Sequence, residues 1–324
     1  MITESAGGRE AGVVDRTADA PVPRSRGRTR RARTGRRAFP YLLNAPAVVV
    51  IFSLIAYPVG LSIWYSLHKY SLRRPGVFDF LGLKNYVTAV TSADFRSALW
   101  VTFEFSAGSV LVALLIGLAL ALILNRRIPG RRLVRALVLV PWAVPPIINA
   151  TMWRLIYDAH TGALNGLLYQ LGLIHRYQDW LTDPRFVVVM VILAFVWNRV
   201  PLVVIVLLAS LQAVPADLYE AARVDRASKW CQFRRITLPW LTRPILIVLI
   251  LETMTSLRSL ELFYVLTSGG PGNSTTVVAW LSYQTSFVNL DFGLGSAYSY
   301  LIVLITAIVT VVYLRLIFAR GEVH

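Results

Sequence analysis

Long apolar blocks separated by shorter polar stretches occupy most of the chain after its first forty residues. Six blocks reach the roughly 20 residues that a helix needs to cross the hydrocarbon core of a bilayer. They cover approximately residues 43–67, 98–124, 133–157, 186–212, 239–263 and 297–318. Backbone groups in lipid must be satisfied internally, and the blocks lack the alternation typical of barrel strands. The pattern therefore predicts an all-α integral membrane protein with six transmembrane helices.

The composition agrees with a bilayer environment. Of the 324 residues, 56% are hydrophobic and 15% are charged, whereas soluble domains carry about 25% charged residues. The single cysteine, Cys231, excludes an internal disulfide and a CxxC metal site. The four histidines are far apart in the sequence. We therefore expect no metal site in this chain.

The first 40 residues differ from the rest, because they lack an apolar face and end in PRSRGRTRRARTGRR. We expect residues 1–40 to form a disordered, basic cytoplasmic tail near anionic lipid headgroups, and residues 41–320 to form the membrane domain. The formal charge of +16 is concentrated in this tail and in loops beside the apolar blocks. Its placement favours contact with the lipid bilayer over contact with nucleic acid.

Basic residues also predict the orientation in the membrane. Segments 125–135 and 213–239 are rich in arginine and fall on the same side as the tail, whereas 264–296 on the other side has no Lys or Arg. Cytoplasmic loops carry the excess of Lys and Arg. The loop at 68–97 has five basic residues and disagrees, but the basic segments on the first side outnumber it. We expect a multi-pass protein with cytoplasmic N- and C-termini.

A charged stretch, EAARVDRASKWCQFRRITLP, lies at residues 220–239 between the fourth and fifth apolar blocks. Pro215 and the acidic residues that follow it predict a helix start, and Glu220 is placed to pair with Arg223 one turn later. A second short helix is predicted after it, ending at Pro239. Two interpretations stay open: an amphipathic segment lying in the membrane interface, or a docking element for a cytoplasmic partner.

This stretch resembles the EAA loop of permease subunits of binding-protein-dependent ABC importers, whose pattern is E-A-A-x-x-D-G-A-x(5)-F-x-x-I-x-L-P. The resemblance extends over residues 40–318 and is closest to the sugar-permease branch that includes maltose and glycerol-phosphate systems. Further stretches match in the expected order: FLGLKNY (80–86), GLALALILN (117–125), VPWAVPP (140–146), VLTSGGPGNST (265–275) and FGLGSAYSYL (292–301).

The resemblance implies that the loop at 213–239 forms two cytoplasmic coupling helices between transmembrane helices four and five. The residues implied in coupling to an ATPase are Glu220, Ala221, Ala222, Asp225, Arg226 and Ala227. One residue departs from the pattern, because Arg226 occupies the position of the glycine. Glycine adopts a positive φ without strain, so either the turn is remade here or Arg226 makes a contact of its own.

The sequence contains no nucleotide-binding motif of its own. A GxxxxGK[ST] sequence is absent, and GGPGNST (269–275) lacks the lysine. No set of nucleophile, base and orienting residue is evident either. We therefore expect no enzymatic activity and no cofactor in this chain, with ATP and Mg²⁺ bound by partner subunits.

Charged and polar residues inside the apolar blocks are candidates for a solute path. Each charge costs about 2.5–3.5 kcal/mol at mid-bilayer on insertion scales, so such residues face a cavity or one another. The positions that correspond to solute contacts in maltose-type members are Trp142, Pro146, Asn198, Arg199, Leu202, Glu252, Ser256 and Ser259. Glu252, Ser256 and Ser259 are spaced to share one helix face. An equally open interpretation is that Glu252 or Glu261 pairs with Arg199 or Arg258.

The resemblance implies an assembly in the inner or cell membrane of a prokaryote. Its partners would be two copies of an ATPase subunit, a second homologous permease forming a heterodimer, and an extracytoplasmic solute-binding protein, which segment 264–296 is a candidate to contact. The cargo would be a sugar or a related polyhydroxy solute. An alternative function is an ion-coupled secondary transporter that uses Glu252 and Glu261, although it leaves the EAA loop unexplained and no inverted repeat is found.

Overall fold

The computed structural model describes residues 43–126 and 129–319, which divide into two compact units at Pro58. The tail predicted at residues 1–40 lies outside the described residues. The first unit contains a helical segment at 43–51, the π-helical turn η1 (Phe52–Ala56) and the start of helix α2 (Tyr57–Ser66).

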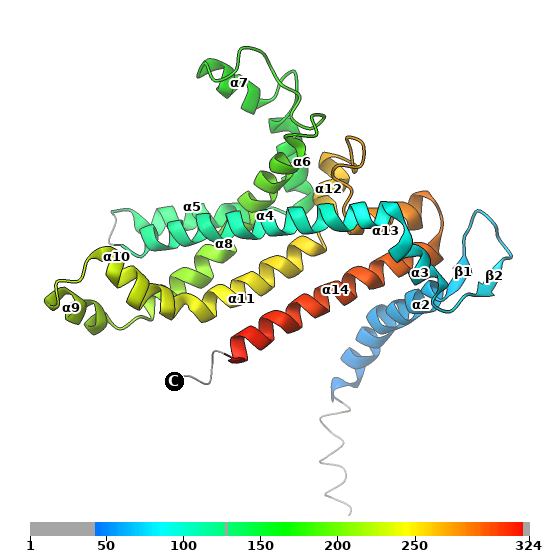
Figure 1. Cartoon of the computed structure of the whole chain (residues 1–324), viewed down its shortest axis with the longest axis horizontal. Helices are drawn as coiled ribbons and strands as arrows, with labels where there is room; N and C mark the ends of the chain where they lie inside the picture. Colours follow the sequence, from blue (N-terminus) through cyan, green and yellow to red (C-terminus); the bar gives the residue numbers. More distant parts are fainter. Residues whose placement is uncertain (1–42, 127–128, 320–324) are drawn as a thin grey trace, which may run out of the picture. The chain divides into compact units, whose positions relative to one another are not determined.

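The second unit is helical apart from one short hairpin (Figure 1). Its first elements are β1 (His68–Tyr70), β2 (Phe78–Phe80), α3 (Lys84–Thr91), α4 (Ala93–Leu124), α5 (Arg131–Ala143), α6 (Pro146–Ile156), α7 (Ala163–Gln170) and α8 (Val187–Gln212). The remainder are α9 (Ala216–Val224), α10 (Lys229–Gln232), η2 (Phe233–Thr237), α11 (Leu238–Leu257), α12 (Glu261–Leu266), α13 (Val278–Tyr283), η3 (Gln284–Val288) and α14 (Phe292–Ala319).

The described helices include the membrane spans that the apolar blocks predict. Five helices are long and apolar enough to cross a bilayer: Leu43–Ser66, Ala93–Leu124, Val187–Gln212, Lys229–Leu257 and Phe292–Arg315. A sixth is present if α5 and α6 count as one span, although they are bent by 98°. The fold class is therefore an all-α membrane protein with up to six candidate spans among the described residues.

Two consecutive prolines explain the bend between α5 and α6. Val144 has an extended backbone (φ −79°, ψ 122°), because a residue before proline avoids the helical region. Pro145 precedes the first turn of α6 and Pro146 begins it, where a missing N–H costs nothing. The predicted third span at 133–157 is consequently two helices with a sharp corner.

Prolines 58 and 239 are accommodated without ending their helices. A π-helical turn precedes each one, and the residue before the proline donates to the carbonyl five residues back: Tyr57 to Phe52, and Leu238 to Phe233. The wider turn gives the proline ring room beside the preceding carbonyls. The prediction that Pro239 ends a helix was wrong, since one helix runs from Lys229 to Leu257.

The predicted fifth block at 239–263 is also broken, at Arg258. This residue has non-helical dihedral angles, and its Nε donates to the carbonyl of Met254 at 3.0 Å. A basic side chain that satisfies a last-turn carbonyl is typical of a helix C-terminus. Glu261 therefore begins a separate helix, α12, and does not continue α11.

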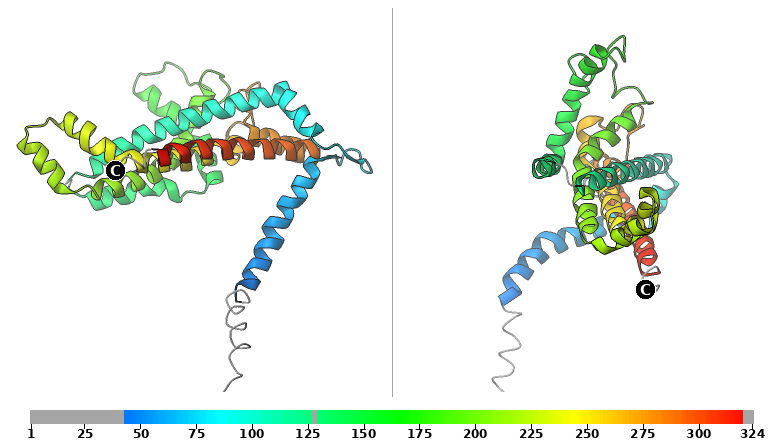
Figure 2. Two further views of the ribbon diagram at one scale, coloured as in Figure 1. Left: turned by 60° about the horizontal axis from the view of Figure 1, so that its bottom comes forward. Right: turned by 90° about the vertical axis from the view of Figure 1, so that its left-hand side faces the viewer.

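The core of the second unit is the contact of α4 with α8, with α11 packed against both. Small residues allow the close approach. A Cβ added to Gly108 would lie 2.8 Å from Cδ1 of Ile192, and one added to Gly117 would overlap the side chain of Val203. Figures 1 and 2 show these long helices running side by side, with α9 at one end and the hairpin β1–β2 at the other.

Residues 157–186, between α6 and α8, are held together by a buried amide. Asn165 is fully buried; its Oδ1 accepts from Trp180 Nε1 at 2.9 Å and from the backbone N–H of Gln178 at 3.1 Å. Nearby, the backbone N–H groups of Thr161 and His160 hold the pKa of Asp158 below its usual value. The segment is therefore an ordered element in spite of its short helix.

We predict that Gly117→Val destabilises the α4–α8 contact. Overpacking a core typically costs about 1–3 kcal/mol, and the β-branched side chain of Val203 has little rotamer freedom with which to move aside. The check is thermal unfolding of the purified protein in mild detergent. Gly60→Ala is the control, because a Cβ at that position meets no atom within 4 Å; equal melting temperatures for both variants would contradict the packing described.

Candidate functional site

The loop between α8 and α11 presents an exposed helix, α9, with no buried residue. Two of its apolar side chains are exposed, Leu218 by 43% and Val224 by 82%. Further along the same loop, Trp230 on α10 is 69% exposed and stacks on Phe233. When exposed apolar side chains form a contiguous patch, the patch marks a surface that contacts a protein or a membrane.

Arg226 closes α9 in a left-handed conformation, with φ of 55°. Its N–H donates to the carbonyl of Arg223 at 3.0 Å, and the N–H of Ala227 donates to the carbonyl of Ala222 at 2.9 Å. This pair of bonds is the Schellman arrangement, in which the left-handed position is usually glycine. The turn is therefore not remade around Arg226; the arginine adopts the glycine conformation, at a cost of about 1–2 kcal/mol.

Two further contacts fix α9. The hydroxyls of Tyr219 and Thr237 lie 2.9 Å apart and connect α9 to η2, at the start of the helix Lys229–Leu257. The predicted pair of Glu220 with Arg223 is confirmed at 3.4 Å, and both side chains are about two-thirds exposed. An exposed pair of this kind contributes little stability, so Glu220 stays available to a partner.

A cavity of about 340 Å³ lies where α6, α8, the end of α11 and the start of α12 meet. It is lined by Pro146, Asn149, Phe195, Asn198, Arg199, Thr255, Arg258, Ser259, Glu261 and Leu262. Four of the eight predicted path residues are among them: Pro146, Asn198, Arg199 and Ser259. The other four, Trp142, Leu202, Glu252 and Ser256, do not line this cavity.

Arg199 and Glu252 form a bidentate ion pair between α8 and α11. Nε and Nη2 of Arg199 donate to the two carboxylate oxygens of Glu252 at 2.9 and 3.0 Å. The side chain of Glu252 is 1% exposed and that of Arg199 15% exposed. The pairing interpretation of these charges is therefore correct, and the remaining exposed edge of Arg199 faces the cavity.

Asn198 holds the corner between α5 and α6. Its Nδ2 donates to the carbonyl of Pro141 at 2.6 Å and to that of Val144 at 3.1 Å. Pro145 lacks an N–H, so the carbonyl of Pro141 accepts from the backbone N–H of Val144 at 3.2 Å, three residues on. Asn198 adds a second donor to this carbonyl, in addition to lining the cavity.

The prediction that Glu252, Ser256 and Ser259 share one helix face was wrong. Helix α11 ends at Leu257, so Ser259 lies beyond it. Ser256 is 2% exposed and its hydroxyl pairs with that of Ser106 on α4. Ser259 alone of the two serines lines the cavity.

The lining residues outside the predicted set have only a weak signal in the sequence. Asn149 is an amide inside the apolar stretch PIINAT, and it is 3% exposed. Its Nδ2 donates to the carbonyl of Ala194 on α8, while its Oδ1 has no partner among the described residues. Arg258 and Glu261 lie within the predicted fifth span. The structure separates them, because Arg258 ends α11 and Glu261 begins α12. Within the described ranges, no cluster of three or more His, Cys, Asp or Glu side chains is placed to hold a metal ion.

The chain matches the family model described as the binding-protein-dependent transport system inner membrane component, over residues 113–321. It is 41% identical to a trehalose/maltose transport system permease protein of Thermococcus litoralis, over 85% of this chain and 92% of that protein. It is 34% identical to a trehalose transport system permease protein of Mycobacterium tuberculosis, over 94% and 95%. The fold is similar to a chain of a bacterial ABC transporter involved in import of the acidic polysaccharide alginate, with a TM-score of 0.73 at 22% identity, covering 91% and 100% of the two chains.

We predict that Arg199→Met alone destabilises the protein by about 3–5 kcal/mol, because it leaves Glu252 buried without a partner. The double variant Arg199→Met/Glu252→Leu removes both charges, and its stability is expected to return most of the way to that of the original protein. Denaturant unfolding in detergent micelles measures all four members of the cycle. Additive losses in the double variant would contradict a direct coupling between the two side chains.

Proposed function

This chain belongs to the family of inner membrane components of binding-protein-dependent transport systems, and we propose that it is the permease subunit of an ABC importer for a disaccharide or related polyhydroxy solute. The proposal on the solute rests on two relatives whose names state trehalose or trehalose/maltose. A cavity lined by amide, hydroxyl and charged side chains agrees with a hydroxyl-rich ligand.

The partners in this proposal are those of an importer. Two ATPase subunits bind ATP and Mg²⁺ and hydrolyse the nucleotide, a second homologous permease completes the path as a heterodimer, and an extracytoplasmic binding protein delivers the solute. Segment 264–296 is a candidate for contact with that binding protein. The N- and C-termini and α9 face the cytoplasm, as the arginine-rich segments favour.

The connection of α9 to the cavity is the observation that carries the proposed mechanism. Helix α9 lies between α8, which carries Arg199, and the helix Lys229–Leu257, which carries Glu252. It is also bonded to the start of the second helix through Tyr219 and Thr237. A displacement of α9 by an ATPase would therefore act on both helices that the ion pair joins.

Access to the cavity would change through such a displacement. Rigid helices transmit a movement at one end to the other, and the cavity lies between α8 and the far end of α11. The corner between α5 and α6 forms another wall, held to α8 by Asn198. Nucleotide-driven movement of α9 would then alternate the side of the membrane to which the cavity opens.

The alternative of an ion-coupled secondary transporter is not favoured. It needs Glu252 and Glu261 as ion sites, but both carboxylate oxygens of Glu252 are bound by Arg199. Glu261 is exposed at the start of α12. Membership of a binding-protein-dependent family also points to an ATP-driven system.

We predict that Glu220→Lys weakens recovery of the ATPase subunits at least several-fold in a mild-detergent pull-down, because it reverses a charge on the exposed face of α9. Uptake of solute is expected to fall with it, while the melting temperature of the membrane domain stays unchanged. Asp79→Lys is the matched control, an exposed acid in β2 at the other end of the helices.

Equal ATPase recovery from the Glu220→Lys and Asp79→Lys proteins would refute the docking role of α9. Recovery of this chain without any ATPase from the unmodified protein would refute the importer assembly itself. A variant that loses both ATPase and thermal stability would indicate a folding role for Glu220 in place of a docking role.

A further inference from the structure

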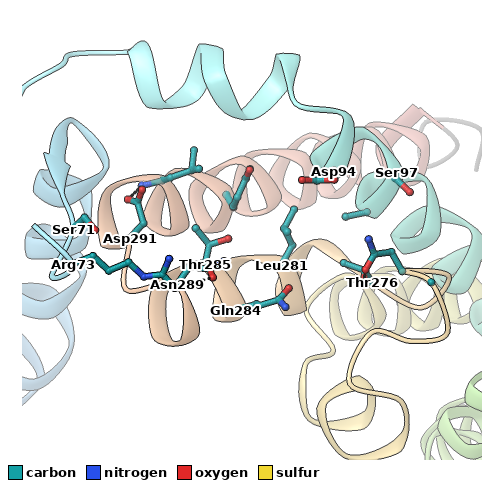
Figure 3. Close-up of a pocket in the computed structure, with 15 residues that line it drawn as sticks. Ser71, Arg73, Asp94, Ser97, Thr276, Leu281, Gln284, Thr285, Asn289 and Asp291 are labelled. Carbon is teal, nitrogen blue, oxygen red and sulfur yellow. Dashed lines mark hydrogen bonds between the residues drawn. The ribbon is translucent and has the colours of Figure 1, made fainter.

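A second and larger cavity, of about 620 Å³, is shown in Figure 3. It lies beside the β1–β2 hairpin and α13, at the opposite end of the helices from α9 (Figure 1). Helix α4 begins at Ala93, next to the lining residue Asp94, and ends at Leu124, near the loop that contains α9; it is 32 residues long. At 1.5 Å per residue the two ends are roughly 45 Å apart. The cavity shares no lining residue with the one beside Arg199, so the two are separate. Part of its wall belongs to segment 264–296, the candidate contact for the binding protein.

Three segments distant in the sequence converge on this cavity, as Figure 3 shows. The loop of the β1–β2 hairpin contributes Ser71 and Arg73, and the start of α4 contributes Asp94 and Ser97. The third segment, from the turn before α13 to the first half of α14, supplies most of the remaining polar side chains: Asn273, Thr276, Gln284, Thr285, Asn289, Asp291 and Tyr298.

Several of these polar groups are not engaged by the protein. The side chains of Asp94, Ser97 and Gln284 make no hydrogen bond or ion pair within the described ranges. Others are partly used: Arg73 donates to Asn289 Oδ1 at 3.4 Å, and Asp291 accepts from the N–H of Leu294 at 3.0 Å. The cavity thus presents a free carboxylate, a hydroxyl and an amide on facing walls.

The π-helical turn η3 supplies an independent observation. The turns η1 and η2 each precede a proline that explains them, but no proline follows η3 at Gln284–Val288. Single π turns are rare and frequently lie at functional sites. This one places Gln284 and Thr285 on the cavity wall, and Ser286 within it packs closely on Gly295 of α14. The preceding helix α13 is bonded to the same residue, since the hydroxyl of Ser282 donates to the carbonyl of Gly295.

The charged side chains that line this cavity indicate which kind of ligand it can bind. Two carboxylates, Asp94 and Asp291, face one guanidinium, that of Arg73, so an anion is disfavoured. A metal ion is not favoured either, because no third acidic, His or Cys side chain joins the two carboxylates. Carboxylate, amide and hydroxyl groups together match the paired donors and acceptors of a neutral compound with many hydroxyls.

We propose that this cavity is a binding site for a neutral, hydroxyl-rich solute, separate from the cavity beside Arg199. The proposal rests on the proposed function for the class of solute, since the same compound would meet this site before reaching the membrane-embedded cavity. Asp94 and Gln284 accept and donate hydrogen bonds to its hydroxyls, and Ser97 lies at the rim.

Protection of an introduced thiol tests the proposal directly. The variant Ser97→Cys is made in a Cys231→Ser background, and the assembled complex is purified and treated with a maleimide, with and without trehalose or maltose. At about ten times the dissociation constant, a ligand is expected to slow labelling at position 97 about tenfold. Thr88→Cys, an exposed position on α3 outside the cavity, is the control and is expected to label at one rate throughout.

The addition of Gln284→Ala is expected to reduce the protection at position 97. Labelling of position 97 at one rate with and without either disaccharide would overturn the proposal. Protection by the solute-binding protein alone would also overturn it, because that result would indicate a protein-docking surface. ATP-dependent uptake is measured in parallel. Uptake without protection of the thiol at position 97 would refute this site and leave the proposed function intact. Protection without uptake would support the site and count against the proposed transport.

Discussion

The buried ion pair of Arg199 with Glu252 is the interaction on which the arrangement of the membrane domain depends. Taking either charge out of water costs several kcal/mol, and only a bidentate geometry with both oxygens bound compensates for that cost. Both oxygens of Glu252 are bound here, at 2.9 and 3.0 Å. The pair therefore fixes the register of α8 against α11 at one height. Those two helices also lead into the exposed loop that contains α9. The position of the loop is therefore physically linked to the helices that line the cavity beside Arg199.

The remaining contacts divide the domain into a tightly packed part and parts that prolines interrupt. Gly108 and Gly117 bring α4 into close contact with α8, so these two helices form a rigid pair. In contrast, the corner at Val144–Pro146 interrupts the candidate third span, and the π turn before Pro239 loosens the start of the helix that bears Glu252. The cavity beside Arg199 lies between α8, one helix of the rigid pair, and the corner at Val144–Pro146. Such a boundary is where a change in access requires the smallest loss of packing.

Much of this architecture could be predicted from sequence, because it depends on local patterns. The apolar blocks predicted the spans, and the EAA resemblance predicted both an exposed helix and a position at residue 226 that favours glycine; Arg226 has φ of 55°. The predictions that failed required knowledge of neighbours. Pro239 does not end its helix, because the preceding π turn makes room for the proline ring. Ser259 does not share a helix face with Glu252, because α11 ends at Leu257. The large polar cavity was not predicted at all, since its walls come from three segments that only the fold brings together.

In the proposed mechanism, movement of α9 changes the distance between the two helices joined by Arg199 and Glu252. Spin labels at Val189 on α8 and Leu251 on α11, both exposed positions, measure that distance in the assembled complex by pulsed electron resonance, in a Cys231→Ser background. ATP is expected to shift the distribution of distances between α8 and α11 when the loop is unmodified, and to leave it unchanged when Glu220→Lys is present. An identical distribution with and without ATP, in a complex that still imports its solute, would refute the proposed coupling.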